Sequence, residues 1–130
     1  MMRKHFISMT YQPKIEPVQD GRCTQTIRTG RKFSVGDSIL MHGWSGRPYR
    51  SPWGWRKRVT VTDILNILIS EIGIHVDDGH IVYPWDDDMP NIWAKLDFID
   101  PPTGEALRDI LFGLNGAPDE PHEYQIIRWS

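Results

Sequence analysis

Aromatic and basic side chains are closely mixed along residues 42–58, HGWSGRPYRSPWGWRKR. Aromatic rings stack on nucleobases and cationic side chains bind phosphates, so this mixture is typical of segments that bind single-stranded nucleic acid. Three glycines and two prolines disfavour regular structure, and we therefore predict a long loop. The residues expected to contact nucleic acid are Tyr49, Arg50, Trp53, Arg56, Lys57 and Arg58. Two alternatives remain open: the tryptophans close one end of the fold, or the loop forms an apolar patch that contacts another protein.

A second candidate site lies in the β-prone segment 24–28, TQTIR. Because alternate residues of a strand share a face, Thr26 and Arg28 should point the same way while Ile27 enters the core. An arginine there can bind a base edge or pair with a phosphate through two hydrogen bonds. The basic turn that follows adds further charge. We expect nucleic-acid contacts from Gln25, Arg28, Arg31 and Lys32.

Cys23, the only cysteine, is a candidate nucleophile. The nearby cations Arg22 and Arg28 could lower the pKa of its thiol and so favour the reactive thiolate. The alternative is a small buried thiol that does no chemistry. A single cysteine cannot form an internal disulfide, which indicates a reducing compartment, and we expect a cytoplasmic protein.

Metal binding finds little support in the sequence. His42, His75 and His80 match no helical zinc-binding spacing. The acidic run 86–88 could bind a divalent cation through oxygen ligands, although such runs are more often solvated loops. We therefore expect neither a metal nor a cofactor.

Composition and charge limit the class of protein. The 130 residues suit a single domain, 1–130, and no run of 18 apolar residues is present, so we expect no membrane partner. Residues 1–58 carry 12 Lys and Arg against three Asp and Glu, whereas residues 59–130 carry three against 14. Such asymmetry favours a polyanionic partner for the basic half. The alternative is that the two halves neutralise each other in the fold.

The hydrophobic pattern predicts an α+β fold, with short strands and turns that suit a small barrel. Proline at the start and Gly21 at the end favour a helix over 13–20. Thr103 is a suitable cap for a helix over 104–114, and Asp78-Gly79 favours a hairpin turn within 75–83. The other expected elements are a first strand or frayed start in 1–8, strands at 24–28 and 39–41, two strands within 59–74, an acidic loop at 85–88, a helix over 92–98 and a closing strand over 123–129.

Four segments, in order, resemble elements of the ASCH domain, a branch of the PUA-like superfamily. Residues 21–28, GRCTQTIR, resemble its G-x-K-T-x-T-x-R element, and Val35-Gly36-Asp37 resembles the V-G-D turn that follows. Residues 93–98, WAKLDF, are similar to its A-x-x-(D/E)-G-F element, and the chain ends like the family in Ile127-Arg128-Trp129. The resemblance covers about residues 5–129. It implies a small pseudo-β-barrel flanked by short helices, with a cleft that takes a nucleotide, often a modified or flipped-out base.

The resemblance also implies where a site would lie. In the family's amidohydrolase branch, which removes an acyl group from acetylated cytidine, a lysine, a threonine and a glutamate converge. The matching positions here hold Cys23, Thr26 and Asp97. Threonine needs an adjacent base or cation to act as a nucleophile, and Cys23 supplies no positive charge. Asp97 keeps the carboxylate of the family's glutamate, on a side chain that is one methylene shorter.

We therefore expect a module that binds RNA or single-stranded nucleic acid and reads one base in a cleft formed by Thr26, Arg28 and Asp97. A structural ion pair between Arg28 and Asp97 is the plainer alternative. The alternative function is a small hydrolase acting on acetylated cytidine or on RNA, with Thr26 or Cys23 as nucleophile and Asp97 in acid–base catalysis.

Overall fold

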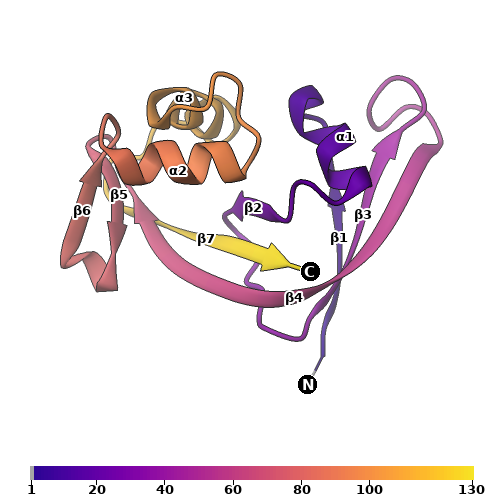
Figure 1. The fold of residues 1–130 in the computed structure, drawn as a ribbon, viewed down its shortest axis with the longest axis horizontal. Coiled ribbons are helices and arrows are strands. Elements are labelled where there is room, and N and C mark those ends of the chain that lie inside the picture. Colours follow the sequence, from indigo (N-terminus) through magenta and orange to yellow (C-terminus); the bar gives the residue numbers. More distant parts are fainter. Residues whose placement is uncertain (1) are drawn as a thin grey trace.

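One long strand, β4 (Trp53–Ile69), runs through the whole molecule and joins its two ends (Figure 1). The computed structural model describes residues 2–130, so Met1, at the start of the expected first strand, lies outside it. The fold is mixed α+β, as the sequence predicts. The remaining elements are β1 (Lys4–Ser8), α1 (Gln12–Asp20), β2 (Gln25–Arg28), β3 (Ser38–Trp44), β5 (Gly73–Val76), a short 3₁₀ turn (Asp77–Gly79), β6 (Ile81–Pro84), α2 (Asp88–Leu96), α3 (Gly104–Asn115) and β7 (His122–Trp129).

The seven strands form one strongly curved sheet. β4 pairs with β3 along its first half and with β7 along its second half, and its register shifts between Val61 and Asp63 where the partner changes. β1 adds to β3 in parallel, β2 adds to β7 antiparallel, and β5 and β6 extend the far end. Within residues 2–130 no ladder joins β1 to β2, so the sheet stays open.

The predicted loop over 42–58 is wrong, because most of this segment is a β-hairpin. β3 continues to Trp44 and β4 begins at Trp53, which leaves only residues 45–52 as a connection. Gly43 does not break the strand; it makes room for a cross-strand ring. A Cβ at Gly43 would lie 1.9 Å from Nε1 of Trp55, so only glycine fits beneath that indole.

Two hydrophobic clusters lie between the sheet and its helices. One contains Ile27, Trp85, Trp93 and Leu107 beneath α2 and α3, and the other contains Val18, Cys23, Met41 and Trp129 beneath α1. All three helices lie on the same side of the long strands β4 and β7 (Figure 1). The longest, α3, has 12 residues, and no helix of the described chain is long and apolar enough to cross a membrane.

The helix ends follow local chemistry. Thr103 accepts a hydrogen bond from the Ala106 amide at 3.1 Å and starts α3, and Gly21 ends α1 in the left-handed region at φ 87°. α2 begins at Asp88, earlier than the predicted residue 92, because Asp87 caps it and Pro90 fits within the first turn. Part of the expected acidic loop therefore belongs to a helix.

A buried hydrogen bond ties β1 to the turn before β3. His5 Nε2 lies 2.9 Å from Oδ2 of Asp37, and Asp37 also accepts hydrogen bonds from the amides of Arg3 and Ser34. Burial alone would raise the pKa of Asp37, but these hydrogen bonds hold it below its ordinary value. The turn that resembles the V-G-D element is thus fixed by its aspartate.

Candidate functional site

Thr26, Arg28 and Asp97 line one pocket, together with Lys14 from α1. We call this the polar pocket; its volume is about 300 Å³, at the lower end of the range for small-molecule sites. Thr26, Ile27 and Arg28 of β2 all line it, and Ile27 also belongs to the hydrophobic core. Thr26 and Arg28 lie on one side of the strand, where Nε of Arg28 donates to Oγ1 of Thr26. Asp97 reaches it from the C-terminal end of α2. Segments about seventy residues apart therefore meet as expected.

Asp97 forms its ion pair with Lys14 and not with Arg28. Lys14 Nζ donates to Oδ1 of Asp97 at 2.9 Å, and both side chains are more than nine-tenths buried, at 6% and 8% exposure. Burial raises the pKa of Asp97, and the positive charges of Lys14 and Arg28 oppose that rise. The alternative of an Arg28–Asp97 ion pair is therefore wrong.

Lys14 is the member of this site that we did not predict. It lies 83 positions from Asp97, so no local motif joins the two. A signal was nevertheless present: Lys14, Pro17 and Val18 have the i, i+3, i+4 spacing of one helix face, so a helix over 13–20 places the lysine beside two apolar residues. The structure buries all three. A lysine on the apolar face of a short helix indicates a buried carboxylate opposite it.

Arg28 keeps its charge available for a ligand. Its Nε donates to Oγ1 of Thr26 at 3.1 Å and its Nη2 lies 3.6 Å from the sulfur of Met9. No carboxylate of residues 2–130 forms an ion pair with it. Burial lowers the pKa of Arg28, yet an arginine in a protein stays protonated. The pocket therefore holds a cation whose remaining donors suit an anion.

Two predicted site residues are turned into the core instead. Cys23 is 0% exposed, its Sγ donates to the carbonyls of Gln25 and Leu96, and burial raises the pKa of its thiol. That is the opposite of the lowering expected from Arg22, which pairs with Asp20. Gln25 is 1% exposed; its amide nitrogen donates to the Trp93 carbonyl, and its amide oxygen accepts a hydrogen bond from Nε of Arg128. Both have structural roles, because their polar atoms are bonded to backbone carbonyls and, for Gln25, to Arg128. Thr26 is equally well buried, at 2% exposure, but it lines the polar pocket.

A second pocket adjoins the first on the outer face of β1, β3 and β4. This aromatic pocket has a volume of about 490 Å³ and no acidic lining residue. Cross-strand register explains its composition: Phe6 and Ser8 of β1 pair with Leu40 and His42 of β3, so their side chains share a face. The main lining side chains are Phe6, Arg31, His42, Trp44, Tyr49 and Trp53.

Ring contacts give the aromatic pocket a fixed shape. Trp53 stacks on His42 with centroids 3.8 Å apart and planes 12° from parallel. The guanidinium of Arg56 lies over the Trp53 ring at 5.4 Å. Tyr49, 73% exposed, shares a hydrogen bond with Ser8 at 2.9 Å between their hydroxyl oxygens. Tyr49, Ser8, Arg28 and the neighbouring Thr29 line both pockets.

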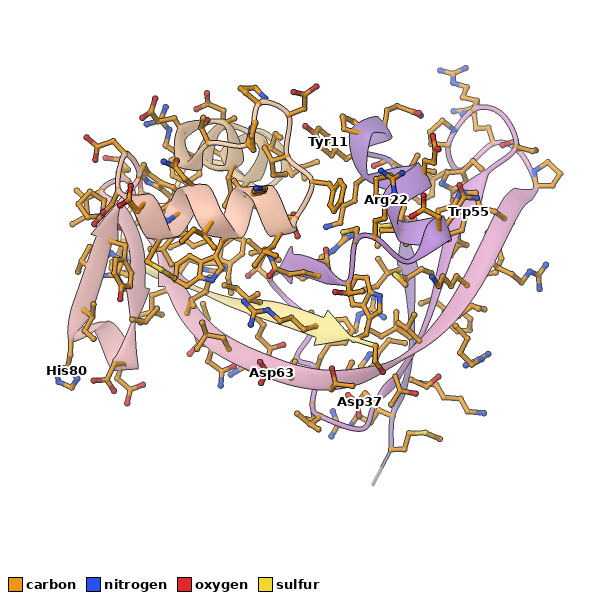
Figure 2. The ribbon with its side chains drawn as sticks, viewed as in Figure 1. Tyr11, Arg22, Asp37, Trp55, Asp63 and His80 are labelled. Carbon is orange, nitrogen blue, oxygen red and sulfur yellow. The ribbon has the colours of Figure 1, made fainter. Side chains whose placement is uncertain are left out.

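The basic residues of β4 separate by strand alternation. Arg56 and Arg58 are exposed on the outer face, opposite His42 and Leu40, and Arg58 also donates to Oγ of Ser38. Lys57 points the other way, where its Nζ donates to the Val18 carbonyl at 2.9 Å and so caps the end of α1. Trp55 lies on that same side, beside α1 (Figure 2). Lys57 is therefore structural, contrary to the sequence prediction.

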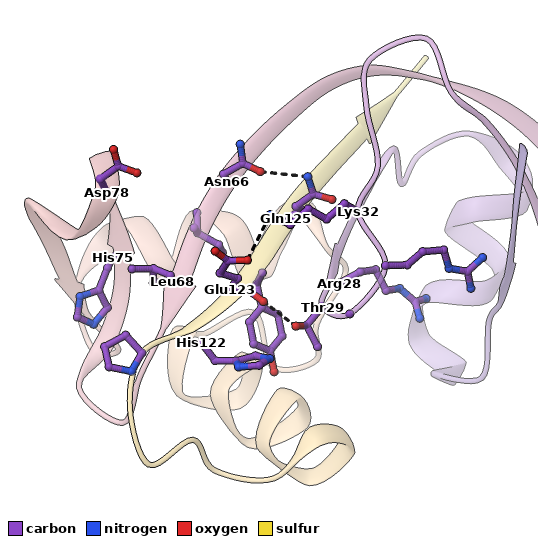
Figure 3. Close-up of a pocket in the computed structure, with 15 residues that line it drawn as sticks. Arg28, Thr29, Lys32, Asn66, Leu68, His75, Asp78, His122, Glu123 and Gln125 are labelled. Atoms are coloured by element: carbon purple, nitrogen blue, oxygen red, sulfur yellow. Dashed lines mark hydrogen bonds and ion pairs between the residues drawn. The ribbon is translucent and has the colours of Figure 1, made fainter. Parts of the chain in front are cut away.

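The remaining predicted basic residues are at the surface. Arg50 is exposed in the connection between β3 and β4, and Lys32 is exposed beside Glu123, 3.2 Å from its carboxylate. Lys32 lines a further groove of about 530 Å³ with Arg28 and Thr29 near one end and His75 and Asp78 near the other (Figure 3). No group of three His, Cys, Asp or Glu in the described structure is placed to hold a metal ion.

Together the pockets can hold a planar polar molecule with an attached anion. The polar pocket supplies a hydroxyl, an ammonium–carboxylate pair and a guanidinium, and the aromatic pocket supplies ring faces.

Among protein-family models, curated proteins and solved structures, none matches this chain.

Proposed function

We propose that this protein binds RNA or another single-stranded nucleic acid and holds one base in the polar pocket. The observation that carries the proposal is Arg28, a half-buried cation with no ion-pair partner in the described structure, which lines both the polar and the aromatic pocket. A guanidinium in this setting suits a phosphate, since it can offer two parallel hydrogen bonds.

The other residues of the polar pocket suit a base edge. The Thr26 hydroxyl can donate as well as accept, and Lys14 keeps two ammonium hydrogens beyond the one it gives Asp97. The rim is apolar, with Ile110, Leu111 and Leu114 of α3 against which a base could pack. A nucleobase has this combination of polar edge and apolar face.

The resemblance to the ASCH domain is part of this proposal. We propose the curved sheet as an open form of the PUA-like pseudo-barrel, with the polar pocket as the family's nucleotide cleft. Support comes from the position of the pocket, which lies where the GRCTQTIR and WAKLDF segments meet.

The test is binding of fluorescently labelled single-stranded RNA ten nucleotides long, followed by anisotropy. We expect binding at low salt that weakens steeply as salt rises, because phosphate contacts release counterions. Arg28→Gln should reduce affinity about tenfold or more, consistent with one charge-assisted contact. Arg108→Gln on α3, which removes an arginine already paired with Asp109, is the matched control and should change little. Absence of binding to any RNA or DNA at low salt would refute the proposal.

A second candidate function, a small hydrolase acting on acetylated cytidine or on RNA, is favoured by one observation. Lys14 places an ammonium in the pocket of Thr26 and Asp97, which compensates for Cys23 at the family's lysine position. A threonine hydroxyl beside a cation and a carboxylate has the groups that acyl transfer needs. Release of cytidine from N4-acetylcytidine measures this activity. Thr26→Val and Asp97→Asn should abolish any turnover, whereas Cys23→Ser should retain it; turnover unchanged by the first two would remove the hydrolase assignment.

A further inference from the structure

Two rings of the aromatic pocket, those of Phe6 and Tyr49, are largely exposed to solvent. Phe6 is 56% exposed and Tyr49 is 73% exposed, although both carry large apolar surfaces. Trp44 and Trp53 complete the same hollow. Exposed clusters of this kind on a small protein mark binding surfaces, because water is a poor partner for apolar rings.

Two side chains of the same pocket carry polar atoms whose hydrogen bonding is unsatisfied. Only three buried side-chain nitrogens of the described residues have no hydrogen-bond partner, and two of them, Nδ1 of His42 and Nε1 of Trp44, belong to side chains that line this pocket. His42 as a whole is only 6% exposed. Burial lowers the pKa of His42, which favours the neutral ring, one nitrogen of which accepts while the other donates. Buried polar atoms without partners are rare unless a water or ligand meets them.

The charges of the pocket limit the ligand class. Arg28 and Arg31 line it and no carboxylate does, so a quaternary ammonium or other cation is disfavoured despite the aromatic walls. A flat ring system linked to an anion fits both the stacking faces and the two guanidinium groups. A nucleotide has this chemistry.

The arrangement of the two pockets indicates how many nucleotides bind. Arg28 and Tyr49 line both of them, so a ligand in one lies next to a ligand in the other. Successive bases of a single strand are joined by one phosphate. Arg28 and Tyr49 lie at the boundary between the two pockets, where such a phosphate would have to pass.

We propose that the protein recognises a dinucleotide step of a single strand, with one base in the polar pocket, the next base among Phe6, Trp44 and Trp53, and Arg28 on the phosphate between them. This inference rests on the proposed function and adds to it: the ligand is an oligonucleotide and not a free nucleoside. Arg31, which lines the aromatic pocket, and Arg56, whose guanidinium lies over the Trp53 ring, extend the positive surface for the rest of the strand.

Isothermal titration calorimetry tests this with eight ribonucleotide probes: ApA, CpC, GpG and UpU and the matching nucleoside 3′-monophosphates. Each pair differs by the second nucleoside, and the monophosphate carries the greater negative charge, so a gain for the dinucleotide cannot come from charge. For the preferred base we expect the dinucleotide to bind about 5- to 150-fold more tightly, the range of one base stacked on aromatic rings.

Substitutions assign the gain to the aromatic pocket. Phe6→Ala should remove most of it while leaving the affinity for the monophosphate within about twofold, and Trp53→Ala should do the same. Phe6 is exposed enough for its replacement to leave the fold intact. Ile72→Ala replaces another exposed apolar residue, 66% exposed in the turn between β4 and β5; it is the matched control and should change neither affinity.

The outcomes separate the two proposals. Binding of monophosphate and dinucleotide with equal affinity, or a gain that survives both aromatic substitutions, would overturn the dinucleotide step and leave the proposed function standing. Absence of binding by every probe and by the ten-nucleotide RNA would overturn both. Loss of a protein partner on Trp53→Ala with unchanged RNA affinity would identify the pocket as a protein interface and also overturn the inference.

Discussion

Replacement of Lys14 by methionine should destabilise the protein strongly and in a pH-dependent way. Lys14 and Asp97 are more than nine-tenths buried and joined at 2.9 Å. Methionine fills a similar volume but leaves the Asp97 carboxylate without its ammonium. Loss of one partner of a buried ion pair costs about 3–5 kcal/mol, because the remaining charge stays desolvated.

The pH dependence follows from Asp97. Burial raises the pKa of Asp97 in the folded protein above its value in the unfolded chain, so the folded state binds the proton more tightly. Stability contributed by this group is therefore lost as pH rises from the unfolded pKa through the folded one. Without Lys14 the folded pKa should rise further. The destabilisation by Lys14→Met should thus be largest at neutral pH and shrink towards pH 4, where Asp97 takes up its proton.

Urea unfolding followed by tryptophan fluorescence at several pH values measures both effects. The double variant Lys14→Met/Asp97→Leu removes both charges and should recover most of the lost free energy of unfolding. Lys32→Met, which breaks an ion pair whose side chains are 72% and 71% exposed, is the control and should cost at most about 1 kcal/mol. A loss for Lys14→Met below about 1 kcal/mol, or one that is the same at pH 4 and pH 8, would refute the reasoning.

Three further outcomes are expected. Asp37→Asn should lower the free energy of unfolding by about 2 kcal/mol at neutral pH. Because the pKa of Asp37 is depressed in the folded protein, the difference from the parent should fade as pH drops below about 4. Urea unfolding at pH 7 and pH 3 measures this, and a pH-independent difference would contradict it. Gly43→Ala should cost about 1–3 kcal/mol, since its Cβ would meet Trp55 at 1.9 Å; an unchanged melting temperature would contradict the close approach. Arg28→Gln should reduce the slope of log affinity against log salt by about 0.7, the value for one phosphate of a single strand, whereas an unchanged slope would place Arg28 away from the phosphates.

Much of the local structure could be predicted from short-range chemistry. Gly21 and Thr103 mark helix ends because a left-handed residue and a side-chain acceptor satisfy backbone groups that lie next to them in the chain. Thr26 and Arg28 share a strand face for the same local reason. The prediction failed at residues 42–58, where glycines and prolines indicated a loop, because Gly43 serves a cross-strand contact with Trp55 that only pairing of β3 with β4 creates.

The sequence by itself determined the residue types available for binding, the alternation that aims Thr26 and Arg28 together, and the basic character of the first 58 residues. Only the tertiary structure decided that Lys14 pairs with Asp97, that Cys23 and Gln25 are buried, and that Lys57 caps a helix while Arg56 faces outward. The physical reason is that periodicity fixes the relative direction of neighbouring side chains, whereas the packing of distant segments decides which of those directions meets core, solvent or another charge.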